Sequence, residues 1–445
     1  MGDRSVVIVE EPAVSGWRSK PVAGVIEDLG RWLLVAAVAS AMLTARTSIG
    51  SVHLGASDLL VVGGVACWGM AWAGSRTRPA MLGVAKWPAL AMFAGIVSMT
   101  ASADLAASLK GLVELLGLWV LPALAIGGLV TSDLWRRRLL SAASAGSLVA
   151  AAINIIVALR IGFSAGLPQV WGAADGFQGY FQVVGIAVAF PRLAAALSER
   201  RTLPSAGWSA ALVLHAMALL LTQTRGAWLA ALVAAAVLGV VWRRAMVVVV
   251  VGVVGAAILV AVSADWAAVI RERALSVIGP QASGAAFDSS VIRVALALSA
   301  WSMFVAHPLT GIGLKTFAMA LPYYAPTGLP LAVEMGPDRV LTPIEGPHST
   351  YLSLLAETGL IGAVAVVGWI ATAWLASHRW SRALPVEAVE RRQIGATVLG
   401  AIAAVAVFSL FGEMNAAGAL PLVAVLALGY GLGGDVQQQR RATHL

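Results

Sequence analysis

The chain has 445 residues, of which 59% are hydrophobic and only 12% are charged. Soluble proteins carry roughly 25% charged residues, so this composition excludes an ordinary soluble enzyme or binding module. A net charge of +8 would suit a nucleic-acid partner only if the basic residues gathered in one patch. They are instead distributed between apolar runs, which predicts no nucleic-acid partner and indicates contact with membrane lipids.

Apolar runs of about 17–25 residues, long enough to cross a bilayer as helices, recur along almost the whole chain. They predict an all-α integral membrane protein with about twelve transmembrane helices. The predicted spans cover residues 29–45, 57–74, 84–102, 112–130, 139–159, 180–197, 206–223, 226–242, 245–263, 350–376, 394–412 and 416–434. The chain thus divides into a first group of spans at 1–263, a long outer segment at 264–347 and a last group at 348–445.

The positions of lysine and arginine predict the orientation. If the N-terminus lies inside, most of the 30 basic residues fall on inside connections, including the arginine runs at 136–138, 200–201 and 243–244. Cytoplasmic loops of membrane proteins carry this excess of positive charge. The pattern therefore predicts an even number of spans, with both the N-terminus and the C-terminus in the cytoplasm.

The outer segment at 264–347 is where we expect function, because a connection of this length usually carries it. Helical spacing predicts one helix over 266–277 and another over 290–305, with a helix stop at His307-Pro308. Prolines then follow at intervals from Pro322 to Pro347. This spacing favours an irregular lid over regular structure.

Three arginines near the outer face are candidates for binding an anion. Arg225 lies between two predicted spans with almost no loop, so it is either an arginine that snorkels to the surface or part of a buried anion site. Arg293 is close to Asp288 and, taken alone, could form a simple surface ion pair. Arg160, at the outer end of the fifth span, is a weaker candidate for a further phosphate contact.

His348 begins the tenth predicted span and follows Pro347. It is either a helix cap or a general base, because histidine alone titrates near neutral pH without help. Two other ionisable residues fall inside predicted spans. We expect His215 to bond to a neighbouring helix, and we expect Glu357, about 13 Å below His348 at helical rise, to be a structural anchor in preference to a proton carrier.

The pattern predicts neither a metal nor another cofactor. The acidic residues of the outer segment are scattered, no cluster of histidine and cysteine has zinc spacing, and no phosphate-binding glycine loop indicates ATP. A phosphate-handling site without a metal must take its positive charge from arginine, and arginines are what the chain offers.

Three motifs resemble those of the O-antigen ligase and polymerase superfamily. They are Thr224-Arg225-Gly226-Ala227, the stretch from Arg293 through His307-Pro308-Leu309-Thr310-Gly311-Ile312-Gly313 to Phe317, and the stretch from Pro347-His348-Ser349-Thr350 to Gly362. They occur in the right order and on the same predicted face. The chain departs from the pattern at Ser349, where members often have asparagine, and at residues 175–182, where many have an Asn-Pro-Asn-like element.

The resemblance implies a GT-C-like, metal-independent, inverting glycosyltransferase of the bacterial inner membrane, with its active site facing the periplasm. Such an O-antigen ligase takes a polysaccharide from undecaprenyl diphosphate and joins it to a hydroxyl of lipid A–core oligosaccharide. Carried over to this chain, His348 is the general base and Arg225 and Arg293 bind the diphosphate. The outer segment 264–347 would then be periplasmic.

Three alternatives remain open. An O-antigen polymerase would pass the glycan to another lipid-linked repeat unit, and a protein O-oligosaccharyltransferase would pass it to a protein. A single large outer segment late in the chain favours the ligase over the polymerase. A proton-coupled secondary transporter using His215 and Glu357 is the distant alternative, because broken spans in paired positions, the usual mark of a transporter site, are not evident.

Overall fold

The computed structural model describes residues 22–43, 46–49, 52–74, 81–161, 175–222, 224–241, 289–326, 332–335, 340–344, 346–385, 388–412 and 419–443. These residues form helices apart from two short antiparallel hairpins. The helical fold that the composition predicts is confirmed in this form. The hairpins pair β1 (Arg46–Ile49) with β2 (Val52–Gly55), and β3 (Ala332–Met335) with β4 (Val340–Pro343).

Each predicted span except 245–263, which lies outside the described residues, coincides with a helix. The first half holds α1 (Val22–Ala41), α2 (Ala56–Gly74), α3 (Met81–Ser98), α4 (Leu105–Leu115), α5 (Leu121–Leu129) and α6 (Asp133–Ile161). The second holds α7 (Asp175–Ser198), α8 (Thr202–Leu221), α9 (Arg225–Val241), α12 (Ser289–Ala306), α13 (Phe317–Tyr324), α14 (Thr350–Ala383), α15 (Val389–Phe408) and α16 (Ala419–Thr443). A single π-helical turn, Leu116–Val120, joins α4 to α5.

In the described part of the chain, 7 helical stretches are long and apolar enough to cross a membrane. They are α2, the stretch from α4 through α5, α6, α7, α8, α14 and α15. α9 and the apolar parts of α12 and α16 are shorter. The chain is therefore a multi-pass membrane protein, and the total of about twelve spans stays a prediction.

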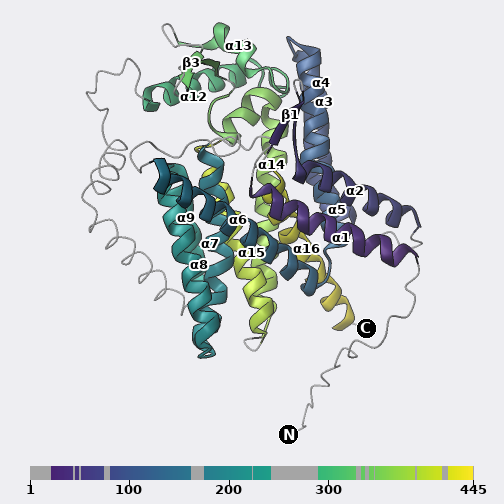
Figure 1. Cartoon of the computed structure of the whole chain (residues 1–445). Coiled ribbons are helices and arrows are strands. Elements are labelled where there is room, and N and C mark those ends of the chain that lie inside the picture. Colours follow the sequence, from purple (N-terminus) through teal and green to yellow (C-terminus); the bar gives the residue numbers. More distant parts are fainter. Residues whose placement is uncertain are drawn as a thin grey trace.

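The helices form one bundle with a separate layer at one end (Figure 1). α7, α8, α9 and α15 pack together, while α14 packs on α3 and α16. α15 is the central helix, and all its residues from Ile394 to Val405 are buried. Most of these residues are small, and small residues let membrane helices approach closely.

Ion pairs fix one end of the bundle, here called the basic end. Arg137 at the start of α6 pairs with Glu390 at the start of α15. Arg391 pairs with Asp133 at 2.6 Å. The first turns of α6 and α15 therefore lie at the same end, as the distribution of positive charge predicts for these two spans.

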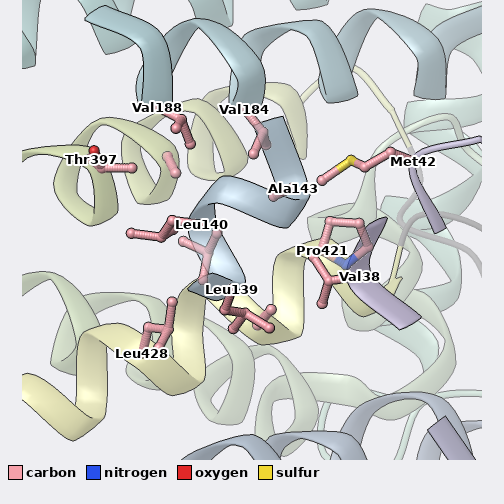
Figure 2. Close-up of a pocket in the computed structure, with 13 residues that line it drawn as sticks. Val38, Met42, Leu139, Leu140, Ala143, Val184, Val188, Thr397, Pro421 and Leu428 are labelled. Atoms are coloured by element: carbon pink, nitrogen blue, oxygen red, sulfur yellow. The ribbon is translucent and has the colours of Figure 1, made fainter. Parts of the chain in front are cut away.

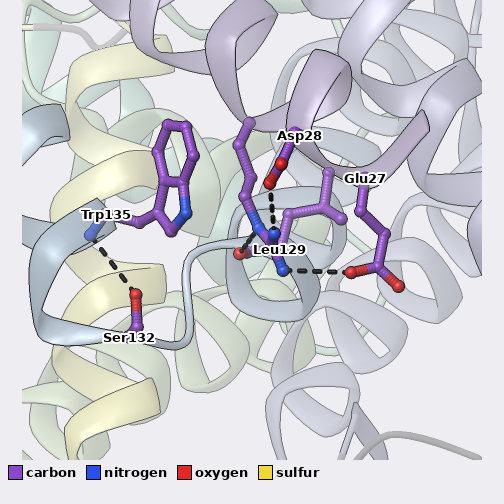
Figure 3. A network of polar contacts seen from close by, with 6 residues as sticks. Glu27, Asp28, Leu129, Ser132 and Trp135 are labelled. Carbon is purple, nitrogen blue, oxygen red and sulfur yellow. Dashed lines mark hydrogen bonds and ion pairs between the residues drawn. The ribbon is translucent and has the colours of Figure 1, made fainter. Parts of the chain in front are cut away.

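Arg31 ties α1 to the connection between α5 and α6 (Figure 3). Its guanidinium donates to the Leu129 carbonyl at 2.9 Å and bonds to Asp28 at 2.8 Å and to Glu27 at 3.1 Å. The same group lies 5.7 Å from the centre of the Trp135 ring. This set of contacts satisfies a half-buried arginine and fixes α1 against the neighbouring helices.

A cavity of about 10 Å³ lies in the core between α1, α6, α7, α15 and α16 (Figure 2). Its lining is apolar except for Thr397. The volume is at the lower limit for one water molecule. A glycan or a lipid headgroup must therefore bind elsewhere.

α12, α13 and the β3–β4 hairpin form the layer at one end of the bundle, here called the cap layer (Figure 1). It has its own core, in which Leu296, Met303, Phe317 and Leu321 pack with Ala356 of α14. α12 confirms the helix predicted over 290–305 and its stop before His307, whereas the helix predicted over 266–277 lies outside the described residues. The expectation of an irregular lid after Pro322 is wrong in part, because α13 includes Pro322 and the hairpin follows.

A kink at Gly359 joins the cap layer to α14. Gly359 has φ 64° and ψ −162°, a conformation that is almost exclusive to glycine. The turn after α12 lies against it: Ile312 N–H donates to the Ala356 carbonyl at 2.9 Å, and Leu360 N–H donates to Pro308 at 2.8 Å. The motif from His307 to Gly313, here called the strap, therefore holds the first turns of α14 in place.

Gly359→Ala is expected to destabilise the protein. The backbone conformation alone costs an alanine about 1–3 kcal/mol, and the added Cβ would lie 2.5 Å from the Leu309 carbonyl oxygen. The midpoint of thermal unfolding in detergent is the measurement. Gly207→Ala is the matched control, because a Cβ at Gly207 in α8 meets nothing within 4 Å. Equal midpoints for the two variants would contradict this role of Gly359.

Candidate functional site

Arg225 is the first residue of α9, at the end of a tight turn that hydroxyl groups hold in place. Thr222 Oγ1 donates to the Leu219 carbonyl at 2.7 Å, and Thr224 Oγ1 donates to the Thr222 carbonyl at 3.0 Å. Trp228 Nε1 also donates to the Leu219 carbonyl, at 3.0 Å. These bonds fix the half-buried Arg225 at a helix N-terminus, where the helix dipole adds to its positive charge.

Two glycines bring this turn close to neighbouring helices. A Cβ on Gly226 would lie 2.6 Å from Cβ of Phe411, just after α15. Gly179 is near the start of α7, and a Cβ on it would lie 2.7 Å from Cβ of Ala227 in α9. The beginning of α9 is therefore packed against the end of α15 and the beginning of α7.

His348 lies directly before α14 with an exposed side chain, between the buried residues Pro347 and Ser349. Its φ is 55°, a left-handed conformation that side chains other than glycine adopt rarely. Such strain persists only where the surroundings impose it, and it concentrates at functional sites. The strained backbone sets His348 apart from an ordinary helix cap.

Hydrogen bonds to the end of α15 hold the residues that follow His348. Thr350 N–H donates to the carbonyls of Ser409 at 2.9 Å and Gly412 at 3.1 Å. Its hydroxyl also donates to Gly412 at 2.9 Å, and Tyr351 OH donates to the Ala406 carbonyl at 3.0 Å. The start of α14 thus satisfies the free carbonyls of α15, and His348 and Arg225 are both anchored on residues 406–412.

Arg293, in the first turns of α12, is the residue that electrostatics joins to these two. Its side chain keeps exposed surface, yet burial by the surrounding chain and then the charge of Arg225 lower the pKa of Arg293. Burial and then the charge of Arg293 likewise lower the pKa of His348. Such effects require charges to be close together, so Arg293 lies near enough to both Arg225 and His348 for their charges to interact.

The neighbouring positive charges favour the binding of an anion. Like charges at the boundary of a membrane protein are unfavourable, and an anion between them relieves the repulsion. The planar guanidinium groups suit phosphate oxygens, to which arginine can donate two hydrogen bonds at once. The arrangement can therefore hold a phosphate or diphosphate beside an imidazole.

Arg160 differs from the other three candidates. It is exposed in the last turn of α6. Among the contacts of the described residues, none links it to Arg225, Arg293 or His348. Its contact with a phosphate stays a prediction.

The two ionisable residues inside predicted spans have structural partners. His215 Nδ1 lies 2.8 Å from Oε1 of Gln182 on α7, which confirms the expected bond to a neighbouring helix. Oε1 of Glu357 accepts a hydrogen bond of 3.2 Å from Phe317 N–H, at the start of α13. This bond supports the expected structural role of Glu357 and joins its turn of α14 to the cap layer, and its depth in the membrane stays a prediction.

Sequence reasoning missed several supporting residues of the site. Lys315, just after the strap, pairs with Glu114 of α4, and Ser108 Oγ donates to the Leu314 carbonyl at 3.1 Å. Tyr180 is fully buried against Phe408, with ring centres 5.6 Å apart. These contacts join residues far apart in sequence, so no local pattern announces them.

Residues 210–367 match the family model described as O-antigen ligase. The match includes Arg225, Arg293 and His348, together with the strap and the kink of α14. These residues form an O-antigen ligase family domain. A search of curated proteins finds no match. The similarity to this family covers residues 210–367 of the 445-residue chain.

Proposed function

We propose that the chain is an O-antigen ligase. It transfers a polysaccharide from undecaprenyl diphosphate to a hydroxyl of lipid A–core oligosaccharide, at the periplasmic face of the bacterial inner membrane. The observation that carries the proposal is that the starts of α9 and α14, which hold Arg225 and His348, both pack on residues 406–412, with Arg293 near enough for its charge to act on His348. Arg225, Arg293 and His348 come from separate parts of the family domain.

His348 is the general base of the proposed reaction. Its imidazole accepts the proton of the acceptor hydroxyl while that oxygen attacks the anomeric carbon of the donor glycan. A new carbon–oxygen bond forms on one face of the sugar, and the bond to the diphosphate breaks on the other. The product has inverted configuration, and the carrier leaves as undecaprenyl diphosphate.

Arg225 and Arg293 bind the diphosphate and stabilise the negative charge that develops on it as the bond breaks. A diphosphate is already a weak base, so it leaves without being protonated. The two guanidinium groups supply the positive charge that the proposed metal-independent mechanism requires. Arg160 is proposed as a further contact on the glycan-bearing lipid, and the mechanism uses no cofactor.

A transfer assay distinguishes the two candidate acceptors, lipid A–core oligosaccharide and a second lipid-linked glycan. Purified protein in detergent receives undecaprenyl-diphosphate-linked glycan and lipid A–core, with a chelator and without ATP, and the products are separated on a gel. Glycan joined to lipid A–core supports the ligase. Lengthening of the lipid-linked glycan would mean that the chain is a polymerase, and transfer to neither acceptor would count against both.

The dependence of transfer on pH tests the role of His348. A base must be neutral, and burial together with Arg293 lowers the pKa of His348. kcat/KM, which reports the free enzyme, is therefore expected to stay high as pH falls to the ordinary histidine value of about 6.5 and to decline only below it. In Arg293→Ala the repulsion is gone, so the decline moves to higher pH.

Arg293→Lys provides the control for this profile, because it keeps the positive charge. Its acidic limb is expected to stay near that of the parent, although its overall rate is lower. An acidic limb that moves to lower pH in Arg293→Ala would contradict the assignment of the limb to His348.

A further inference from the structure

α12 is apolar on opposite sides. Leu296, Ala300 and Met303 face the core of the cap layer and are fully buried. After Arg293 the helix contains no charged residue up to its end at Ala306. A helix that is hydrophobic all round normally lies within a protein core or in a membrane.

The side of α12 away from that core carries an exposed stripe of large apolar side chains. The stripe consists of Val294, Leu298, Trp301 and Val305, which follow one another at helical spacing and are 61%, 55%, 52% and 60% exposed. Trp301 also packs on Phe304, with ring centres 5.3 Å apart. An exposed apolar face of this kind marks an interaction surface.

Three observations place the stripe at the level of the membrane surface. α12 packs on α14, and its core includes Ala356, in the second turn of the span that begins at Thr350. His348, coupled to Arg293, precedes the span that begins at Thr350. In Figure 1, α12 lies between α13 and the bundle.

We propose that α12 is an interfacial helix whose stripe is immersed in the lipid of the membrane face at which the site opens. Its apolar part, Ile292–Ala306, is too short to cross a hydrocarbon core of about 30 Å at 1.5 Å per residue. It is therefore held between its own protein core on one side and acyl chains on the other. Trp301 suits this position, since tryptophan concentrates at membrane interfaces.

An immersed α12 also determines how ligands reach the site, whether or not the chain is a ligase. Arg293 lies on the flank of the same helix, so the cluster of Arg225, Arg293 and His348 borders the lipid layer. An amphiphile with a phosphate head can then reach these cations from the membrane without passing through water.

Site-directed fluorescence in nanodiscs tests the proposal. Cys67, the only cysteine, is replaced by alanine, and Leu298→Cys is labelled with an environment-sensitive dye. The nanodiscs contain phosphatidylcholine and phosphatidylglycerol, with or without a lipid that carries a spin label near the head of its acyl chain. Tyr323→Cys is the matched control, because Tyr323 belongs to α13 in the same layer and is 85% exposed.

The expected result is a blue-shifted emission at residue 298 and a loss of fluorescence with the spin-labelled lipid, while iodide in the water quenches only the label at residue 323. Val305→Cys, on the same stripe, should behave like Leu298→Cys, which guards against a local folding defect. Quenching of both stripe labels by iodide would overturn the proposal, because the stripe would then face water. Quenching by neither agent would also overturn it, because residues 242–288 or a second copy of the chain would then cover the stripe.

Discussion

His348→Ala is expected to lower the rate of glycan transfer by about 10²–10⁴-fold, which is the usual contribution of a general base. The loss should appear mainly in kcat, because the imidazole acts on the acceptor hydroxyl as the bond forms, whereas the donor is held by Arg225 and Arg293. Steady-state transfer by purified variants, at saturating donor, measures it.

Two further variants separate loss of the base from loss of structure. His348→Asn keeps a polar side chain that tolerates a positive φ, so the fold is preserved while the base is absent, and its activity should match that of His348→Ala. His378→Ala, near the other end of α14, should transfer at the parent rate. A His348→Asn variant with parent activity would show that the imidazole is not the base.

The second large effect concerns the arginine pair. Arg225→Ala and Arg293→Ala should each lower kcat/KM by roughly ten- to hundredfold, since a hydrogen bond to a charged group contributes about 1.5–3 kcal/mol and 1.4 kcal/mol corresponds to a factor of ten. If both bind one diphosphate, the double variant should lose less than the product of the two single losses. Initial rates over a range of donor concentrations give the three ratios.

Lysine at these positions provides the comparison. Arg293→Lys keeps the charge but cannot donate two parallel hydrogen bonds to phosphate, so it should recover only part of the loss. Strictly multiplicative losses for Arg225→Ala and Arg293→Ala would mean that the two residues act at independent places. That result would remove the shared diphosphate site.

Much of the fold follows from patterns within single segments. Runs of apolar residues indicate spans, and the arginines at 136–138 and 391–392 indicate which ends lie together, as the pairs of Asp133 and Glu390 bear out. α12 was predictable because apolar residues repeat at helical spacing and His307-Pro308 stops the helix. Each of these signals lies within a single segment, so it can be recognised in the sequence without knowledge of the tertiary contacts.

The parts that could not be predicted depend on contacts between distant segments. The kink at Gly359 exists because the strap occupies the space beside it, and no local pattern separates such a glycine from one in open space. His348 has a positive φ directly before Thr350, whose N–H donates to carbonyls just after α15, and the sequence near His348 does not reveal that contact. The motifs suggested which residues act together, but their proximity required the packing of α9 and α14 on residues 406–412 and of α12 on α14.

Binding of undecaprenyl diphosphate is the measurement that probes the shared diphosphate site of Arg225 and Arg293 with the fewest components, because it needs neither the native glycan nor the acceptor. Radiolabelled carrier is added to purified protein in detergent with a chelator, for the parent, for the double variant Arg225→Ala/Arg293→Ala, and for Arg379→Ala near the far end of α14 as a control. Saturable binding by the parent and by Arg379→Ala, lost in the double variant, is the predicted result. Equal affinity of the parent and the double variant would contradict a diphosphate site built from these two arginines.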